Sequence, residues 1–110
     1  MPDTPVLDTL AEITAVSVER GTLEAREHML SRLAALVAVD APASSYLLNL
    51  GTAADVGVTL EDVEGVLIAV APLVGTARVM SAAGKITKAL GFAIAVVEAE
   101  LEAELAAETE

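Results

Sequence analysis

The polar side chains that could take part in chemistry lie in two short stretches of an otherwise apolar chain. A carboxylate beside an imidazole can transfer protons, and hydroxyl or amide groups can orient a small carbonyl or carboxylate ligand. We treat the carboxylate, the imidazole and one serine hydroxyl as candidate catalytic groups. The remaining hydroxyl and amide groups are candidate ligand-binding groups. The candidate catalytic residues are Glu27, His28 and Ser45, and the candidate ligand-binding residues are Tyr46, Asn49 and Thr52.

The charged candidates have a structural explanation beside the functional one. Glu27 flanks the apolar face of its helix and is expected to point inward, so burial could raise its pKa into the range of a general acid or base. The favoured interpretation is instead an ion pair with Arg26, Arg32 or a neighbouring subunit. Histidine is the side-chain type suited to proton transfer near neutral pH, but His28 is expected on the polar side of the same helix, where a solvated or interface histidine is the simpler interpretation.

The neutral candidates share one face of the next predicted helix. Ser45, Asn49 and Thr52 follow at helical spacing, with Tyr46 at the edge of this face, and residues 41–54 carry no charge. They either line a ligand pocket or satisfy one another and nearby backbone in a buried interface. Ser45 is a poor nucleophile, because only His28, on another helix, could serve as its base.

The composition argues against several classes of function. The 110 residues include no cysteine, which removes thiolate nucleophiles and cysteine-based metal sites. A single histidine leaves no zinc site, so we expect no metal and no cofactor. The net charge of −11 predicts that neither nucleic acid nor a membrane surface is bound. The uncharged run 65–77 is shorter than the roughly 18 residues of a membrane span and contains Pro72, which predicts a buried helix.

Helix signals recur along the whole chain. Asp40 ahead of Pro42 is typical of a helix start, Gly57 of a left-handed helix end, and Thr59 before two acids of another start. Gly91 is expected to interrupt the last helix. We predict an all-α, compact domain of five to six helices over residues 1–97, followed by an acidic helical tail at 98–110 that frays. The expected helices are 3–20, 23–39, 42–56, 60–75, 77–90 and 92–97.

The apolar character of so short a chain predicts self-association. Hydrophobic residues make up 55% of the sequence but aromatic residues only 2%, and the mean hydropathy is +0.63. Without large aromatic anchors, a subunit interface is needed to cover this surface, so we expect a homo-oligomer. The N-terminus has no signal-peptide pattern, which predicts a cytoplasmic location.

Residues 57–91, GVTLEDVEGVLIAVAPLVGTARVMSAAGKITKALG, resemble the C-terminal half of the carboxymuconolactone decarboxylase family, which includes the alkyl hydroperoxidase D-like proteins. The shared pattern is a glycine, a hydroxyl residue, acids, a hydrophobic helix that ends near a glycine, and an alanine-rich helix. Upstream, EAREHMLSRLAALVAV resembles the preceding helix of the family, so the resemblance covers about residues 22–91. It implies an alkyl hydroperoxidase D-like fold and a trimer or hexamer.

The family's redox residues are missing from this chain. Pro42, Ser45 and Asn49 stand where the peroxidase branch has two cysteines and a histidine, which excludes a cysteine-dependent peroxidase. The decarboxylase branch commonly keeps the histidine that Asn49 replaces. We therefore predict a family-like homo-oligomer that binds a small carboxylate or carbonyl ligand or a partner, or serves as a structural subunit. The alternative is a cofactor-free decarboxylase, lyase or isomerase acting on a small carbonyl or lactone acid.

Overall fold

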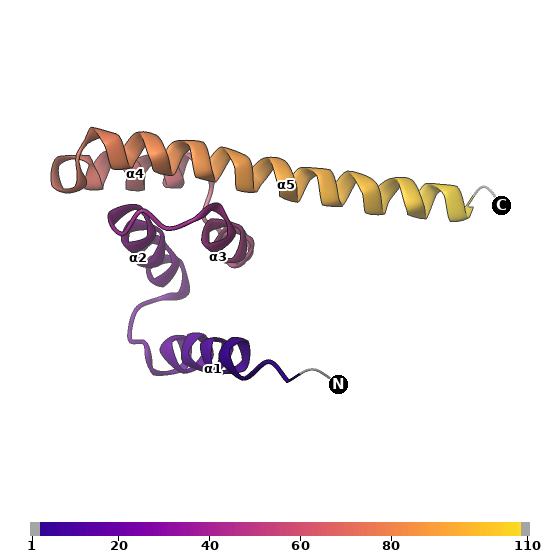
Figure 1. The fold of residues 1–110 in the computed structure, drawn as a ribbon, viewed down its shortest axis with the longest axis horizontal. Helices are drawn as coiled ribbons and strands as arrows, with labels where there is room; N and C mark the ends of the chain where they lie inside the picture. Colours follow the sequence, from indigo (N-terminus) through magenta and orange to yellow (C-terminus); the bar gives the residue numbers. More distant parts are fainter. Residues whose placement is uncertain (1–2, 109–110) are drawn as a thin grey trace.

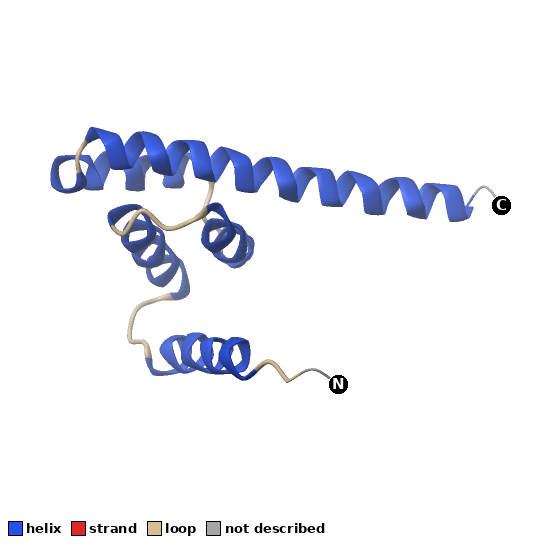
Figure 2. Ribbon diagram, viewed as in Figure 1, coloured by secondary structure: helices blue, strands red, loops and turns tan. Residues whose placement is uncertain are grey.

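The computed structural model describes residues 3–108, and within this range it contains five α-helices and no strand (Figure 2). The all-α prediction is confirmed for the described part of the chain. Residues 1–2 of the predicted domain and residues 109–110 of the predicted tail lie outside the described range. The helices are α1 (Pro5–Arg20), α2 (Ala25–Ala38), α3 (Ala43–Asp55), α4 (Leu60–Val74) and α5 (Thr76–Glu108).

Local signals in the sequence set the boundaries of α4. Gly57 and Gly75, which precede and follow this helix, have φ values of 88° and 89°, a left-handed conformation that suits glycine. The predicted start at Thr59 is also confirmed. Its hydroxyl accepts a hydrogen bond of 3.1 Å from the Asp62 backbone N–H, and the Asp62 carboxylate accepts one of 2.9 Å from the Thr59 N–H. This capping box satisfies two N–H groups that the helix leaves free.

The expected role of Asp40 as a helix cap is wrong. The N-cap position of α3 belongs to Pro42, and Asp40 adopts a φ of 54° in the turn before it. The Asp40 carboxylate instead accepts hydrogen bonds from Ser81 (2.7 Å) and Lys85 (2.9 Å) of α5. The turn between α2 and α3 is thereby tied to a helix about 40 residues further along the chain.

The predicted interruption at Gly91 is also wrong. One helix, α5, runs without a break through 33 residues and therefore measures about 50 Å. The separate helix expected at 92–97 and the helical part of the expected tail are both portions of it. A single glycine inside a helix costs only about 1 kcal/mol relative to alanine, which the good helix formers around it offset.

The core lies between α2, α3, α4 and α5. Its largest fully buried side chains are Met29, Leu33 and Val37 of α2 and Tyr46 of α3. The side chains that α5 buries are mostly small, which lets it approach the other helices closely; they are Ala82, Ile86 and Ala89. Burial along α5 ends at Ala89.

Two parts of the molecule project from this core (Figure 1). Helix α1 has no buried residue and lies apart from the bundle. Residues 91–108 of α5, here called the overhang, run past the other helices, and only Ala93 among them is even partly covered. The radius of gyration is 16.4 Å, compared with about 13 Å for a compact chain of this length. The expectation of a compact domain is therefore wrong.

Candidate functional site

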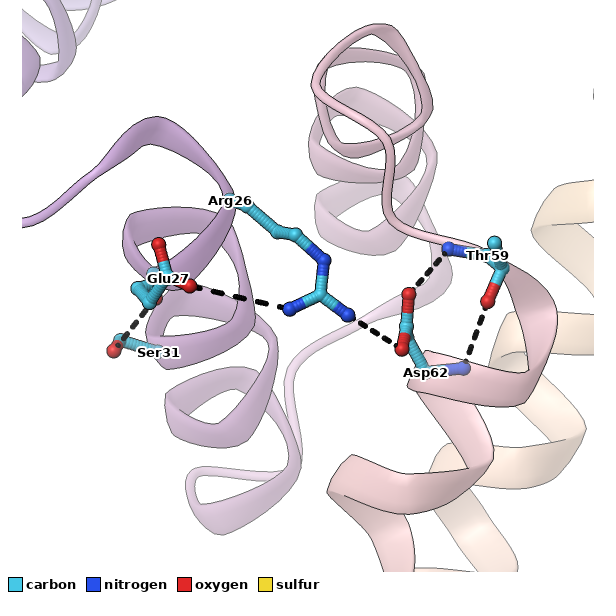
Figure 3. Close-up of polar contacts among 5 residues, drawn as sticks. All are labelled: Arg26, Glu27, Ser31, Thr59 and Asp62. Atoms are coloured by element: carbon cyan, nitrogen blue, oxygen red, sulfur yellow. Dashed lines mark hydrogen bonds and ion pairs between the residues drawn. The ribbon is translucent and has the colours of Figure 1, made fainter.

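Glu27 does not point inward as expected. Its side chain is 51% exposed and faces Arg26 at a distance of 4.0 Å (Figure 3). The core-facing side of α2 is set by Met29, and a residue two positions earlier lies about 200° around the helix from it. Glu27 therefore lacks the buried, apolar surroundings that the general acid or base hypothesis assumed for it.

His28 is more enclosed than its expected place on the polar side of α2. The residue is half-buried, and its Nε2 atom is buried without a hydrogen bond to any described residue. It packs below the C-terminal end of α1, where a Cβ atom added to Gly21 would come within 3.3 Å of the imidazole Nδ1. The histidine thus fills the junction between α1 and α2, and Gly21 leaves room for it.

Of the four candidates on α3, Ser45, Asn49 and Thr52 lie along one partly exposed side of the helix, whereas Tyr46 turns away from them. Tyr46 is fully buried in the core, where its hydroxyl has no hydrogen-bond partner among the described residues. Burial raises the pKa of Tyr46, and the nearby charge of Asp40 adds to this effect. The Asn49 amide donates a hydrogen bond of 2.8 Å to the backbone carbonyl of Ser45, as the structural interpretation expects. Thr52 is exposed.

A shallow groove of about 320 Å³, with both polar and apolar lining, lies between α1, α2 and α3 and contains one of the candidates, Asn49. Arg32 supplies a cation in this groove, and its guanidinium donates a hydrogen bond of 3.2 Å to the Thr14 carbonyl. Sequence reasoning missed Arg32 because nothing in its helix distinguishes it from other surface bases. The groove is lined by Ile13, Thr14, Ser17, Arg32, Ala35, Leu36 and Asn49.

A close ion pair between α2 and α4, beside the candidate residue Glu27, stabilises the fold. Figure 3 shows the Arg26 guanidinium reaching across to the Asp62 carboxylate, which it contacts at 2.6 Å. The pKa of Asp62 is lowered by the hydrogen bond from the Thr59 backbone and further by Arg26. Arg26, Thr59 and Asp62 therefore serve to start α4 and to join it to α2.

A second groove, almost wholly apolar, lies between α3 and the start of the overhang. It has a volume of about 440 Å³ and continues onto apolar side chains that the subunit leaves uncovered. Among them Ile94, Val97 and Leu101 are 58%, 60% and 54% exposed. A surface of this kind takes apolar groups and offers no polar chemistry. It is lined by Leu47, Leu50, Gly51, Ala54, Ala89, Leu90, Phe92, Ala93, Val96 and Val97.

By length and composition α5 is also long and apolar enough to cross a membrane. Part of its apolar surface, however, belongs to the core through Ala82, Ile86 and Ala89. The uncharged run from Ala89 to Val97 measures only about 13 Å along the axis, compared with the roughly 30 Å of a hydrocarbon core. Beyond Ala89 most apolar side chains of α5 are left uncovered by the rest of the subunit.

Comparison with known proteins adds no family to this picture. No protein-family model, no curated protein and no solved structure matches the chain. Within residues 3–108, no three His, Asp or Glu side chains are grouped so that they could hold a metal ion. The resemblance to the carboxymuconolactone decarboxylase family therefore stays a prediction, and the functional argument comes from the surfaces of the molecule itself.

Proposed function

We propose that the protein is a homo-oligomeric subunit that acts by binding rather than by catalysis, with the overhang and α1 in its subunit contacts. The observation that carries this proposal is the size of its surface, 7810 Å². A folded monomer of 11.2 kDa typically exposes only about 5,700 Å². The excess of about 2,000 Å² matches the area that each subunit covers in a large obligate interface.

The chemistry of the uncovered surface supports the same proposal. Exposed large apolar side chains concentrate on the two projecting segments, α1 and the overhang. Many exposed large apolar side chains on one segment are typical of a surface that another protein covers. On α1 the exposed side chains are Val6, Leu7, Leu10, Ile13, Val16 and Val18, and on the overhang they are Phe92, Ile94, Val96, Val97, Leu101 and Leu105.

The alternative, a cofactor-free decarboxylase, lyase or isomerase, has less support. Glu27 is exposed to water, and the Asn49 amide is already bonded to the backbone. Ser45 would need His28 as its base, but the His28 ring packs at the junction with α1. These residues do not form an acid–base pair around a common cavity.

The mass of the full-length protein in solution tests the proposal. Light scattering coupled to size exclusion should give a multiple of 11.2 kDa. Replacing both Ile94 and Val97 by Glu should reduce the mass, and circular dichroism should show that the helices persist, because both side chains are exposed in the subunit. Leu73→Glu is the matched control, since Leu73 is 86% exposed on α4 and its replacement should leave the mass unchanged. A wild-type monomer would overturn the proposal.

A second candidate function, the binding of a small carboxylate, is favoured by one observation. Arg32 and Asn49 line the same groove, and a guanidinium has more donors than its one bond to Thr14 uses. Titrating ¹⁵N-labelled protein with acetate or pyruvate should shift amide signals around this groove, and Arg32→Gln should remove the shifts. Equal shifts in wild type and variant would exclude Arg32 as the binding group.

A further inference from the structure

We propose that two copies of the chain pair through antiparallel α5 helices, with residues 90–101 of one helix lying against the same residues of the other. This inference rests on the proposed homo-oligomer and names its contact. Three features of α5 support it: the spacing of the apolar side chains, the division of charge along the helix, and the neighbours of two glutamates.

The apolar side chains of this segment form a stripe that reads the same in both directions. Leu90, Ile94, Val97 and Leu101 follow at steps of four, three and four residues, which places them on one face of the helix. In an antiparallel pair centred between residues 95 and 96, Leu90 meets Leu101 and Ile94 meets Val97. Leu90 is partly covered by the core, whereas the other three are more than half exposed. The stripe thus begins at the edge of the subunit and continues along the overhang.

Charge is divided along α5 in a way that favours the antiparallel direction. Residues 76–97 contain three bases and no acid, and residues 98–108 contain five glutamates and no base. This order is unfavourable within the helix itself, because its dipole prefers acids at the N-terminal end and bases at the C-terminal end. An antiparallel partner brings each acidic half alongside a basic half and opposes the two dipoles. A parallel partner would place the five glutamates beside five glutamates.

The residues that flank the stripe favour the same direction. Glu98 and Glu100 lie on either side of it, at the edges where two packed helices meet. In the antiparallel pair they come opposite Gly91 and Ala93, whose small neutral side chains leave the carboxylates in water. In a parallel pair each would come close to the same glutamate of the partner, and like charges repel at this spacing.

The geometry of the subunit leaves the required surface free. The overhang extends about 27 Å beyond the last buried turn of α5, and the proposed contact needs about 18 Å of helix from each copy. In Figure 1 the C-terminal part of α5 runs clear of the other helices. The glutamates beyond Leu101 extend past the contact toward the partner's Lys85 and Lys88.

Distances between spin labels in the full-length protein test the direction. The chain has no cysteine, so one cysteine placed at an exposed glutamate carries one nitroxide per copy. We would label Glu98→Cys, Glu102→Cys, Glu104→Cys and Glu108→Cys separately and measure the distance between copies by pulsed electron paramagnetic resonance. The antiparallel pair requires this distance to rise by about 3 Å per residue, twice the helical rise, so that labels at 108 lie roughly 30 Å further apart than labels at 98.

The outcomes separate this inference from the proposed function. Label distances that rise steadily toward the C-terminus would support the antiparallel pair. The dipolar coupling between copies should also disappear when Ile94 and Val97 are both replaced by Glu. Distances that stay constant along the helix would show a parallel pair and overturn the antiparallel one. A protein of oligomeric mass without dipolar coupling at any of the four positions would overturn this contact but leave the homo-oligomer standing. A monomer would overturn both.

Discussion

Asp62 of α4 accepts a hydrogen bond of 2.6 Å from Arg26 of α2, a residue 36 positions earlier in the chain. The same carboxylate also accepts the N–H of Thr59 and so completes the cap of its own helix. One side chain therefore both starts α4 and fixes it against α2. The ion pair and the capping box share their anion, so changes in either one affect the other.

Arg26 and Glu27 are neighbours in sequence but contribute differently to the stability of the fold. We expect Arg26→Gln to lower the midpoint of urea unfolding measurably, because it removes the close partner of Asp62. Glu27→Gln should change the free energy of unfolding by less than about 0.5 kcal/mol, because it breaks only an exposed contact of 4.0 Å. Equal losses in the two variants would contradict this assignment.

Asp40 and Asp62 make the stability of the fold depend on pH in the acidic range. Hydrogen bonds from Lys85 and then Ser81 lower the pKa of Asp40, and those from Thr59 and then Arg26 lower the pKa of Asp62. A lowered folded-state pKa means that the stabilisation is complete above the unfolded value of 3.8 and is lost as the pH falls through the folded-state pKa. The stability advantage of wild type over Asp40→Asn and Asp62→Asn should therefore shrink below about pH 4.

That comparison uses the difference between wild type and variant at each pH, because relief of the net negative charge changes the stability of both. Chemical unfolding between pH 6 and pH 2.5 supplies the measurement. A difference that stays constant over this range would show that neither carboxylate has a lowered pKa in the folded protein.

Thr59 and Thr52 provide a matched pair of threonines. Thr59→Ala removes the hydroxyl that accepts the Asp62 N–H, and we expect a loss of about 1 kcal/mol in the free energy of unfolding. Thr52→Ala replaces an exposed residue inside α3 and should be neutral or slightly stabilising, because alanine has the higher helix propensity. A loss at Thr52 as large as at Thr59 would indicate a contact that the subunit alone does not contain.

Tyr46 carries a buried hydroxyl without a partner among the described residues. An unpaired group of this kind costs roughly 1–3 kcal/mol, so Tyr46→Phe should stabilise the protein, by about 1 kcal/mol. Tyr46→Ala, which empties a core position, should instead cost about 3–5 kcal/mol. Thermal and urea unfolding measure both variants. A destabilised Tyr46→Phe would mean that the hydroxyl has a partner in solution, as the ligand-binding hypothesis for this residue requires.

Short-range signals predicted the helices because their causes lie within a few residues. Gly57 supplies a left-handed conformation, and the hydroxyl of Thr59 faces an N–H three residues away, so both boundaries follow from local chemistry. The prediction of a helix break at Gly91 failed because one glycine only weakens a helix. Whether the helix is interrupted there depends on the surrounding residues. The predicted helix-cap role of Asp40 failed because its partners, Ser81 and Lys85, belong to a helix that only the fold brings close.

The candidate site depended on orientation, which periodicity fixes only approximately. The sequence predicted Glu27 beside the apolar face of α2 and His28 on its polar side. Packing of Met29 toward the core then turned Glu27 outward and enclosed His28 beneath α1. Tyr46, expected at the edge of a polar face, became part of the core because α3 contacts both α2 and α5.

By itself, the sequence determined that this chain is helical, acidic and free of cysteine chemistry, since each of these follows from composition or from interactions within a few residues. Only the tertiary structure decided that most apolar side chains of α1 and the overhang stay exposed, and that the six candidate residues do not form one pocket. The physical reason is that a helix can bury only the side that another element covers. Which side that is depends on contacts between residues far apart in the chain.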